Sequence, residues 1–234
     1  MALVQYGAGV VQISGSIAGD THARNRFGNY IRPRTKPVDP KSARQMAARL
    51  LVMMLAEQWR EDPMTDLIRG VWDTYAAAVA MQNRLGQEVR LTGFNHFIRS
   101  NCARIAAGLA LVTAGPTDLG LPSADPTLAV VGSEASGELS VTFDNTKPWA
   151  DETGAALSVE MHIPQSASRN FFGGPWRNAG SILGVTGTPP TSPAVLDAPF
   201  SLVELQKTRC RARIIRADAR ASTFFSADPF VVGA

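Results

Sequence analysis

The stretch LSVEMHI, residues 157–163, alternates apolar and polar side chains without a break. Successive side chains of a β-strand point to opposite faces, so this pattern predicts a strand with one buried and one wet face. The stretch LSVTF, residues 139–143, alternates in the same way. Shorter strand-like runs occur at 128–131, 182–185, 210–215 and 224–231, with turn clusters between them. We therefore expect an antiparallel β-sandwich domain over residues 127–234.

The chain before this domain is typical of helices. Residues 41–60 contain no Gly or Pro and many strong helix formers, and Asp39-Pro40 is a favourable helix start. Their apolar side chains recur at three- and four-residue spacing, which predicts a buried stripe. The members of that stripe are Ala47, Leu50, Leu51, Met54 and Leu55.

Two more helices are expected after this one. Asp62-Pro63 repeats the start signal, and Thr92 can cap a third helix. Short connections between the three favour a small helical unit over residues 39–115. Residues 116–126, rich in Pro, Gly and Asp, are interpreted as a linker to the β-domain.

Residues 1–38 are rich in Gly and show weak hydrophobic periodicity, so we expect no core of their own. They nevertheless hold several apolar side chains, which favours an extended arm that orders by lying on another surface. Five cations alternate with other residues near its end, and in an extended chain this spacing puts most of them on one face. They are Arg24, Arg26, Arg32, Arg34 and Lys36.

The net charge of +3 is unevenly distributed. Residues 1–49 carry eight Lys/Arg and two Asp/Glu, residues 50–115 are neutral, and residues 116–234 carry nine and twelve. A basic arm on a near-neutral body indicates an acidic partner. The alternatives are nucleic acid, the acidic surface of another subunit, or a solvated tail without a partner.

The sequence carries none of the well-marked catalytic or metal-binding motifs. Its three histidines lie in three different segments, and no His-x-x-x-His, Cys-x-x-Cys, phosphate-loop or Gly-x-Ser-x-Gly pattern occurs. The two cysteines, Cys102 and Cys210, are expected to be free. No apolar run is long enough to span a bilayer. We therefore predict a protein that is not an enzyme, has no cofactor and does not enter a membrane.

Two segments of the β-domain are candidate contact sites. Gly173-Gly174-Pro175 sets an unusual backbone path beside three aromatic side chains, which are hot-spot residue types at interfaces. These are Phe171, Phe172 and Trp176; the alternative is a loop that its own aromatics close. The second segment is a basic strand whose alternating cations would make a stripe for nucleic acid, or would pair with acids such as Glu160 across the sheet. Its cations are Lys207, Arg209, Arg211, Arg213 and Arg216.

Residues 128–230 resemble a fibronectin type III or immunoglobulin-like module in the spacing of their strands and in the late Arg-rich strand 207–217, which a turn at Asp218-Ala219-Arg220 follows. The upstream stretch RFGNYIRPRTKPVDPKSARQMAARLLVMMLAEQW, residues 26–59, resembles uncharacterised proteins of bacterial phages and prophages. These combine a Gly/Arg-rich arm, a short helical segment and a C-terminal β-module. The resemblance implies a structural protein of the virion without catalysis.

The sequence thus predicts an α+β chain of several segments: an arm, a helical unit and an immunoglobulin-like or fibronectin III-like β-sandwich. Its expected role is a phage virion component, in the capsid, connector or tail, made in the host cytoplasm. Its expected partners are copies of itself or other virion proteins, with the arm as the lock. The alternative is a nucleic-acid-binding protein that uses the arm and the strand at 207–216.

Overall fold

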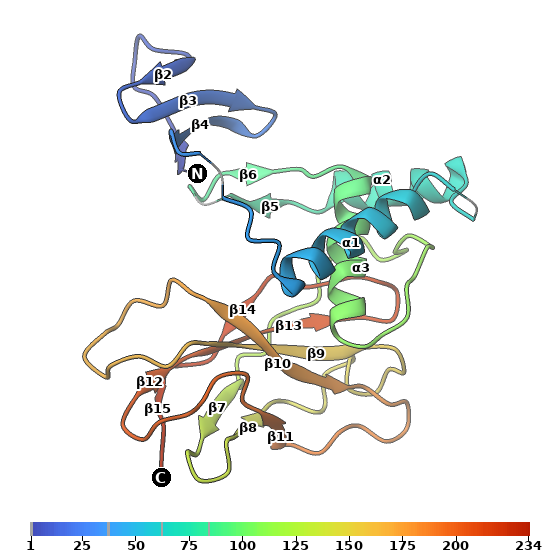
Figure 1. The fold of residues 1–234 in the computed structure, drawn as a ribbon. Helices are drawn as coiled ribbons and strands as arrows, with labels where there is room; N and C mark the ends of the chain where they lie inside the picture. The colour runs from blue at the N-terminus through green and yellow to red at the C-terminus, as the bar shows by residue number, and fades with distance from the viewer. Residues whose placement is uncertain (1, 37, 62, 84) are drawn as a thin grey trace.

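A computed structural model describes residues 2–36, 38–61, 63–83 and 85–234. It confirms a mixed α+β protein, with three helices and several antiparallel sheets (Figure 1). The residue Asp62 of the expected second helix start lies outside the described residues.

The N-terminal segment forms a sheet of four strands with the order β1-β4-β3-β2. The strands are β1 (Ala2–Val4), β2 (Gly15–Ile17), β3 (Asp20–Asn25) and β4 (Gly28–Pro33). The expectation of an extended arm over residues 1–38 is therefore wrong, because these backbone groups pair with one another. A hairpin turn at Arg26-Phe27 starts the pairing, with the amide of Phe27 bonded to the side chain of Asn25 and Gly28 at a φ of +123°. We call residues 2–36 the N-terminal β-module.

Three helices follow: α1 (Ala43–Gln58), α2 (Asp66–Ala78) and α3 (Gly93–Ala106). A short hairpin of β5 (Met81–Gln82) and β6 (Glu88–Val89) lies between α2 and α3. The cap expected at Thr92 is confirmed, since its side chain accepts a hydrogen bond from the amide of Asn95. The start expected at Asp39-Pro40 is wrong by three residues. Ser42 caps α1 with Gln45 in a capping box, while Asp39 pairs with Arg49.

The C-terminal strands form two main sheets. The first has the order β10-β9-β13-β14 and the second the order β11-β8-β7, and a small pair joins β12 to β15. The strand bounds are β7 (Ala129–Gly132), β8 (Glu138–Thr142), β9 (Ala156–His162), β10 (Trp176–Leu183), β11 (Ala194–Asp197), β12 (Lys207–Thr208), β13 (Cys210–Ile215), β14 (Phe225–Ser226) and β15 (Phe230–Val231). The sequence patterns had not indicated β11, and the single strand expected at 207–217 is divided into β12 and β13, which lie in different sheets.

One buried cluster joins the inner faces of the two main sheets. Leu139 and Val141 of β8 contribute to it from one side, and Leu157 and Val159 of β9 from the other. A second cluster, around Trp72, Tyr75 and Phe97, holds the helices together. Cys102 and Cys210 are free.

The helical unit is fastened to the larger sheet by arginine side chains. Arg104 of α3 is almost fully buried and donates to the carbonyl oxygens of Ala110, Gly154 and Arg216 at 2.7–3.1 Å. Arg99 donates to the carbonyl oxygens of Ala221 and Ser222. These bonds reach the β13–β14 turn, whose Ala219 is itself buried in the helical cluster.

Candidate interaction surfaces

The chain from Ala2 to Met54 contributes no buried side chain among its described residues. The first buried residue is Leu55, in the last part of α1. This region nevertheless contains a four-stranded sheet and most of a helix. It is therefore the part of the molecule whose side chains are least covered by the rest of the chain.

The five basic side chains predicted as a contact stripe all lie in the N-terminal β-module and are exposed. The structure does not bring them to one face. Register pairs Arg24 of β3 with Asn29, and Arg32 of β4 with Thr21, so the two arginines point to opposite faces of the sheet. Arg26 lies in the hairpin turn, which reverses the chain, and Arg34 and Lys36 follow β4. Within the described residues none of the five makes an ion pair.

Helix α1 presents an exposed apolar stripe. Met46, Leu50, Met53 and Met54 are 39%, 53%, 51% and 45% exposed, and we call these four residues the α1 stripe. The sequence prediction placed Ala47, Leu50 and Met54 in the core, but all three are exposed. That prediction is wrong because α1 packs on the helical cluster only through its C-terminal part, with Leu55 buried and Leu51 half-buried.

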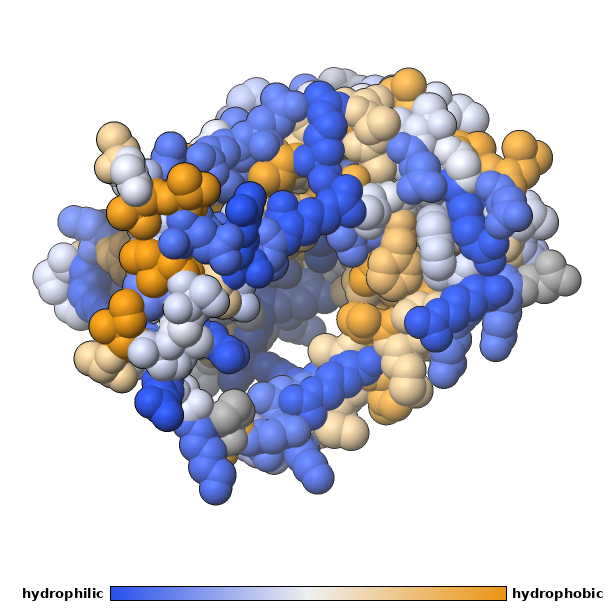
Figure 2. Space-filling view, turned by 90° about the horizontal axis from the view of Figure 1, so that it is seen from above, coloured by the Kyte–Doolittle hydropathy of each residue, from blue (hydrophilic) through white to orange (hydrophobic). Residues whose placement is uncertain are grey.

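One signal in the sequence could have revealed this surface. The run from Leu50 to Ala56 is apolar at every position, so it surrounds the helix rather than following one face. A helix on a protein surface buries a single stripe, and the remainder stays outside. The view from above shows hydrophobic side chains at the surface and a hollow between the parts of the molecule (Figure 2).

The cations of the basic strand are engaged within the chain. Arg211 pairs with Glu160 at 2.6–2.8 Å, as the cross-strand alternative predicted, and Arg216 pairs with Glu152. Arg209 donates to the carbonyl of Ala227, and Lys207 to the side chain of Asn170. The guanidinium of Arg213 lies 4.7 Å from the ring centre of Phe224, and burial lowers its pKa. This strand therefore offers little free positive charge to a phosphate backbone.

The aromatic loop before β10 packs partly on itself. The rings of Phe172 and Trp176 meet His162 edge to face, with centroids 5.2 and 5.1 Å apart, and Arg211 stacks 4.4 Å above Trp176. Only Phe171 projects outward, 78% exposed. The structure thus brings two of the three predicted contact aromatics together inside the loop and leaves one outside.

A surface pocket of about 570 Å³ lies at this loop. Its volume falls within the range of ligand-binding sites. His162, Gln165, Ser166, Arg169 and Phe171 are among its lining residues. The Nδ1 of His162 lies 2.6 Å from the carbonyl oxygen of Ile163, which favours the tautomer with the proton on that nitrogen. The Nε2 of the same ring is buried, so His162 offers the pocket no accessible ring nitrogen.

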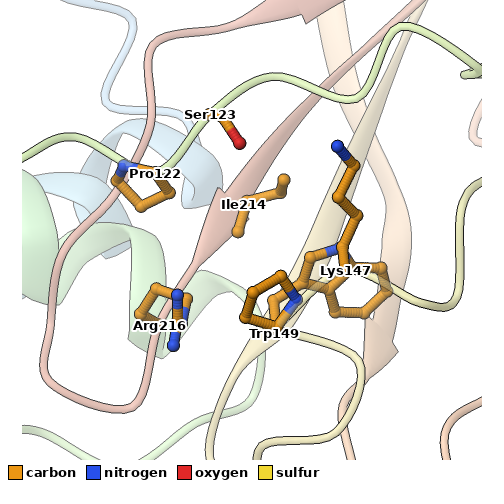
Figure 3. A pocket seen from close by; sticks show the side chains of 7 residues that line it. Pro122, Ser123, Lys147, Trp149, Ile214 and Arg216 are labelled. Atoms are coloured by element: carbon orange, nitrogen blue, oxygen red, sulfur yellow. The ribbon is translucent and has the colours of Figure 1, made fainter.

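A second, much smaller pocket lies where the linker meets β13. Figure 3 shows Ile214 between Ser123 and Lys147, with Trp149 and Arg216 below. Its volume of about 50 Å³ is too small for a cofactor. It is a packing gap beside the linker.

Burial shifts the proton affinity of two ring side chains between α2 and α3. Burial and the nearby charge of Arg99 lower the pKa of His96 to about 4, and burial raises the pKa of Tyr75 to about 12. The two rings meet edge to face at 5.1 Å. Both groups are therefore neutral near pH 7, as a buried aromatic pair requires.

The described part of the chain contains no group of three or more His, Cys, Asp or Glu side chains that could hold a metal ion. Within it, no helix is long and apolar enough to cross a membrane. Comparisons with family models, with curated proteins and with solved structures find no match for this chain.

Proposed function

We propose that this chain is a non-enzymatic structural protein that acts by assembling with copies of itself or with other virion proteins of a bacteriophage. One observation carries the proposal: residues 2–36 and 38–54 form a sheet and a helix without burying a side chain. A sheet or helix whose apolar side chains stay half-buried or exposed gains less from folding alone, because burial is the main favourable term. A neighbouring subunit would supply that burial.

The α1 stripe supports the same proposal. Its three methionines and one leucine lie at helical spacing on one exposed side, and Met is adaptable at interfaces. A scattered exposed apolar residue needs no explanation, but a continuous stripe on a helix indicates a contact surface. The virion as location, and production in the host cytoplasm, rest on the resemblance in layout to phage and prophage proteins.

We also propose that the C-terminal domain is a β-sandwich of the fibronectin III or immunoglobulin-like type. Its strands β7, β8, β9, β10, β11, β13 and β14 would correspond to A, B, C, C′, E, F and G. The sheet orders β11-β8-β7 and β10-β9-β13-β14 would then be E-B-A and C′-C-F-G. The shared core between the two sheets supports this assignment.

The test of assembly is the oligomeric state of the full chain. We expect the wild type to self-associate in sedimentation equilibrium, and the double variant Leu50→Glu/Met53→Glu to dissociate while keeping its circular dichroism spectrum. Leu67→Glu is the matched control, since Leu67 is 82% exposed on α2, outside the stripe. A wild type that stays monomeric at every concentration, alone and with its virion partners, would overturn the proposal.

A second candidate function is nucleic-acid binding, and the five unpaired cations of the N-terminal β-module favour it. The strand at 207–216 contributes little to it, because its cations are engaged internally. If the module binds phosphates, affinity for duplex DNA will fall steeply with salt, with a log–log slope near −0.9 for each phosphate neutralised. A shallow slope would exclude this candidate.

A further inference from the structure

The outer face of the sheet β11-β8-β7 carries a shallow apolar groove. Register places Val131, Ser140 and Val195 abreast, one on each strand. The two valines are 61% and 60% exposed, and the small serine between them leaves a groove of about 190 Å³. Because both valines are mostly exposed, no described element of the chain covers the groove.

Carboxylates border one end of this groove. Glu138 of β8 stands directly opposite Asp197 of β11 in the register, and both are exposed. Like charges at such a position destabilise a sheet. In the part of the chain that the structure describes, neither makes an ion pair. Glu134, in the β7–β8 hairpin, accepts a hydrogen bond from the backbone amide of Glu204.

The N-terminal β-module carries charge of the opposite sign, and register places Ile17 of β2 on the same face as Arg24 of β3. It carries five unpaired cations against one carboxylate, Asp20, and it exposes Val11 and Ile17 by 83% and 58%. Cations matched to carboxylates beside matched apolar side chains give register and specificity to an interface. We propose that the outer face of β11-β8-β7 receives the N-terminal β-module of a second copy of this chain. This inference rests on the proposed assembly function and names the surface that the module binds.

The positions of the two surfaces determine the kind of assembly. The N-terminal β-module lies at one end of the molecule and the β11-β8-β7 sheet at the opposite end (Figure 1). A contact between different surfaces on two copies is head-to-tail, and its repetition produces a ring or a filament. Both β2 and β11 are edge strands of their sheets, so main-chain hydrogen bonds between copies can add to the contact.

Charge reversal on either side tests this contact. The module variant is Arg24→Glu/Arg32→Glu, which alters both faces of its sheet, and the groove variant is Glu138→Arg/Asp197→Arg. Each variant alone should self-associate at least about tenfold more weakly than the wild type in sedimentation equilibrium, because like charges then meet. Asp228→Arg/Glu61→Arg, an equal charge change at exposed positions elsewhere, should leave association unchanged.

Mixing the two variants gives the sharpest result. The unaltered groove of one then meets the unaltered module of the other, and the two reversed surfaces also attract, so equimolar mixing should restore association. If the wild type assembles but the groove variant assembles equally well, or mixing restores nothing, this inference is overturned and the proposed assembly function stands. If the wild type is monomeric and the module instead binds duplex DNA, both are overturned.

Discussion

Two four-stranded antiparallel sheets in this molecule differ in how far their residues are buried. In β10-β9-β13-β14, strand β9 buries six of its seven residues. In β1-β4-β3-β2, strand β4 buries none of its six. Both sheets pair their backbone groups, yet β9 of the first buries nearly all its side chains, whereas β4 of the second leaves them half-buried or exposed.

The difference separates hydrogen bonding from stabilisation. A backbone hydrogen bond replaces one to water and contributes modestly in net terms, whereas burial of apolar surface provides the main driving force. The C-terminal sheet therefore contributes more to the stability of the chain than the N-terminal sheet does. Four predictions compare these regions and the joint between them.

The largest contrast should come from one residue type in the two sheets. Ile214 is 2% exposed and Ile17 is 58% exposed. Ile214→Ala should lower the free energy of unfolding by about 4 kcal/mol, because it removes buried methyl groups and leaves a cavity. Ile17→Ala should lower it by less than about 0.5 kcal/mol in the isolated chain. Urea denaturation measures both, and similar losses would remove the distinction between the two sheets.

The joint between helices and sheet depends on Arg104. Arg104→Met preserves the length of the side chain but leaves the carbonyls of Ala110, Gly154 and Arg216 without their donor. We expect a loss of about 3 kcal/mol, since unpaired buried polar groups are costly. Arg49→Met on exposed α1 is the control, because its ion pair with Asp39 is exposed and contributes little. An equally small loss for Arg104→Met would show that the joint is weak.

Acid should destabilise the helical unit through His96. Its folded pKa of about 4 lies below the ordinary value of 6.5, so the unfolded chain binds a proton first as the pH falls. Stability is then complete above pH 6.5 and decreases towards pH 4, by about 3 kcal/mol at that pH. His96→Leu should remove this part of the pH dependence in urea titrations. His22 and His162 are present in both the wild type and the variant, so the difference between the two pH profiles is due to His96.

Local patterns predicted several strands of the C-terminal region. The wet face expected for 157–163 is wrong, because β9 is covered on both sides and Ser158 and His162 are buried. The alternation at 139–143 and 157–163 corresponds to β8 and β9, and the basic strand at 210–215 to β13. Strand β11, Ala194–Asp197, was not predicted because the prolines on both sides of it, Pro189, Pro190, Pro193 and Pro199, are typical of a loop. The groove beside Glu138 depends on that strand, so it could not be predicted either.

The N-terminal region was predicted less well for a physical reason. Hydrophobic periodicity arises where one face of an element is buried. Where a segment has no buried face, its sequence pattern does not indicate which strands pair. The turn at Arg26-Phe27 contains no Gly at its centre, so the hairpin between β3 and β4 lacked its usual signal. The apolar content of α1 was interpreted as core because sequence alone cannot distinguish a buried apolar side chain from an exposed one.

The smallest predicted change in stability compares two residues that both have a positive φ, one buried and one exposed. Ala219 has a φ of 69° and is fully buried in the helical cluster, while Leu205 has a φ of 65° and is 70% exposed. Glycine relieves about 1–2 kcal/mol of strain at such a φ and loses about 0.5–1 kcal/mol to unfolded-chain entropy. At Ala219 it also loses a buried methyl group, about 0.8 kcal/mol. Ala219→Gly should therefore be close to neutral and Leu205→Gly slightly stabilising, a difference below about 1 kcal/mol that thermal unfolding of the two variants resolves. The reverse order would mean that the methyl group of Ala219 contributes nothing to the contact between the β13–β14 turn and the helices.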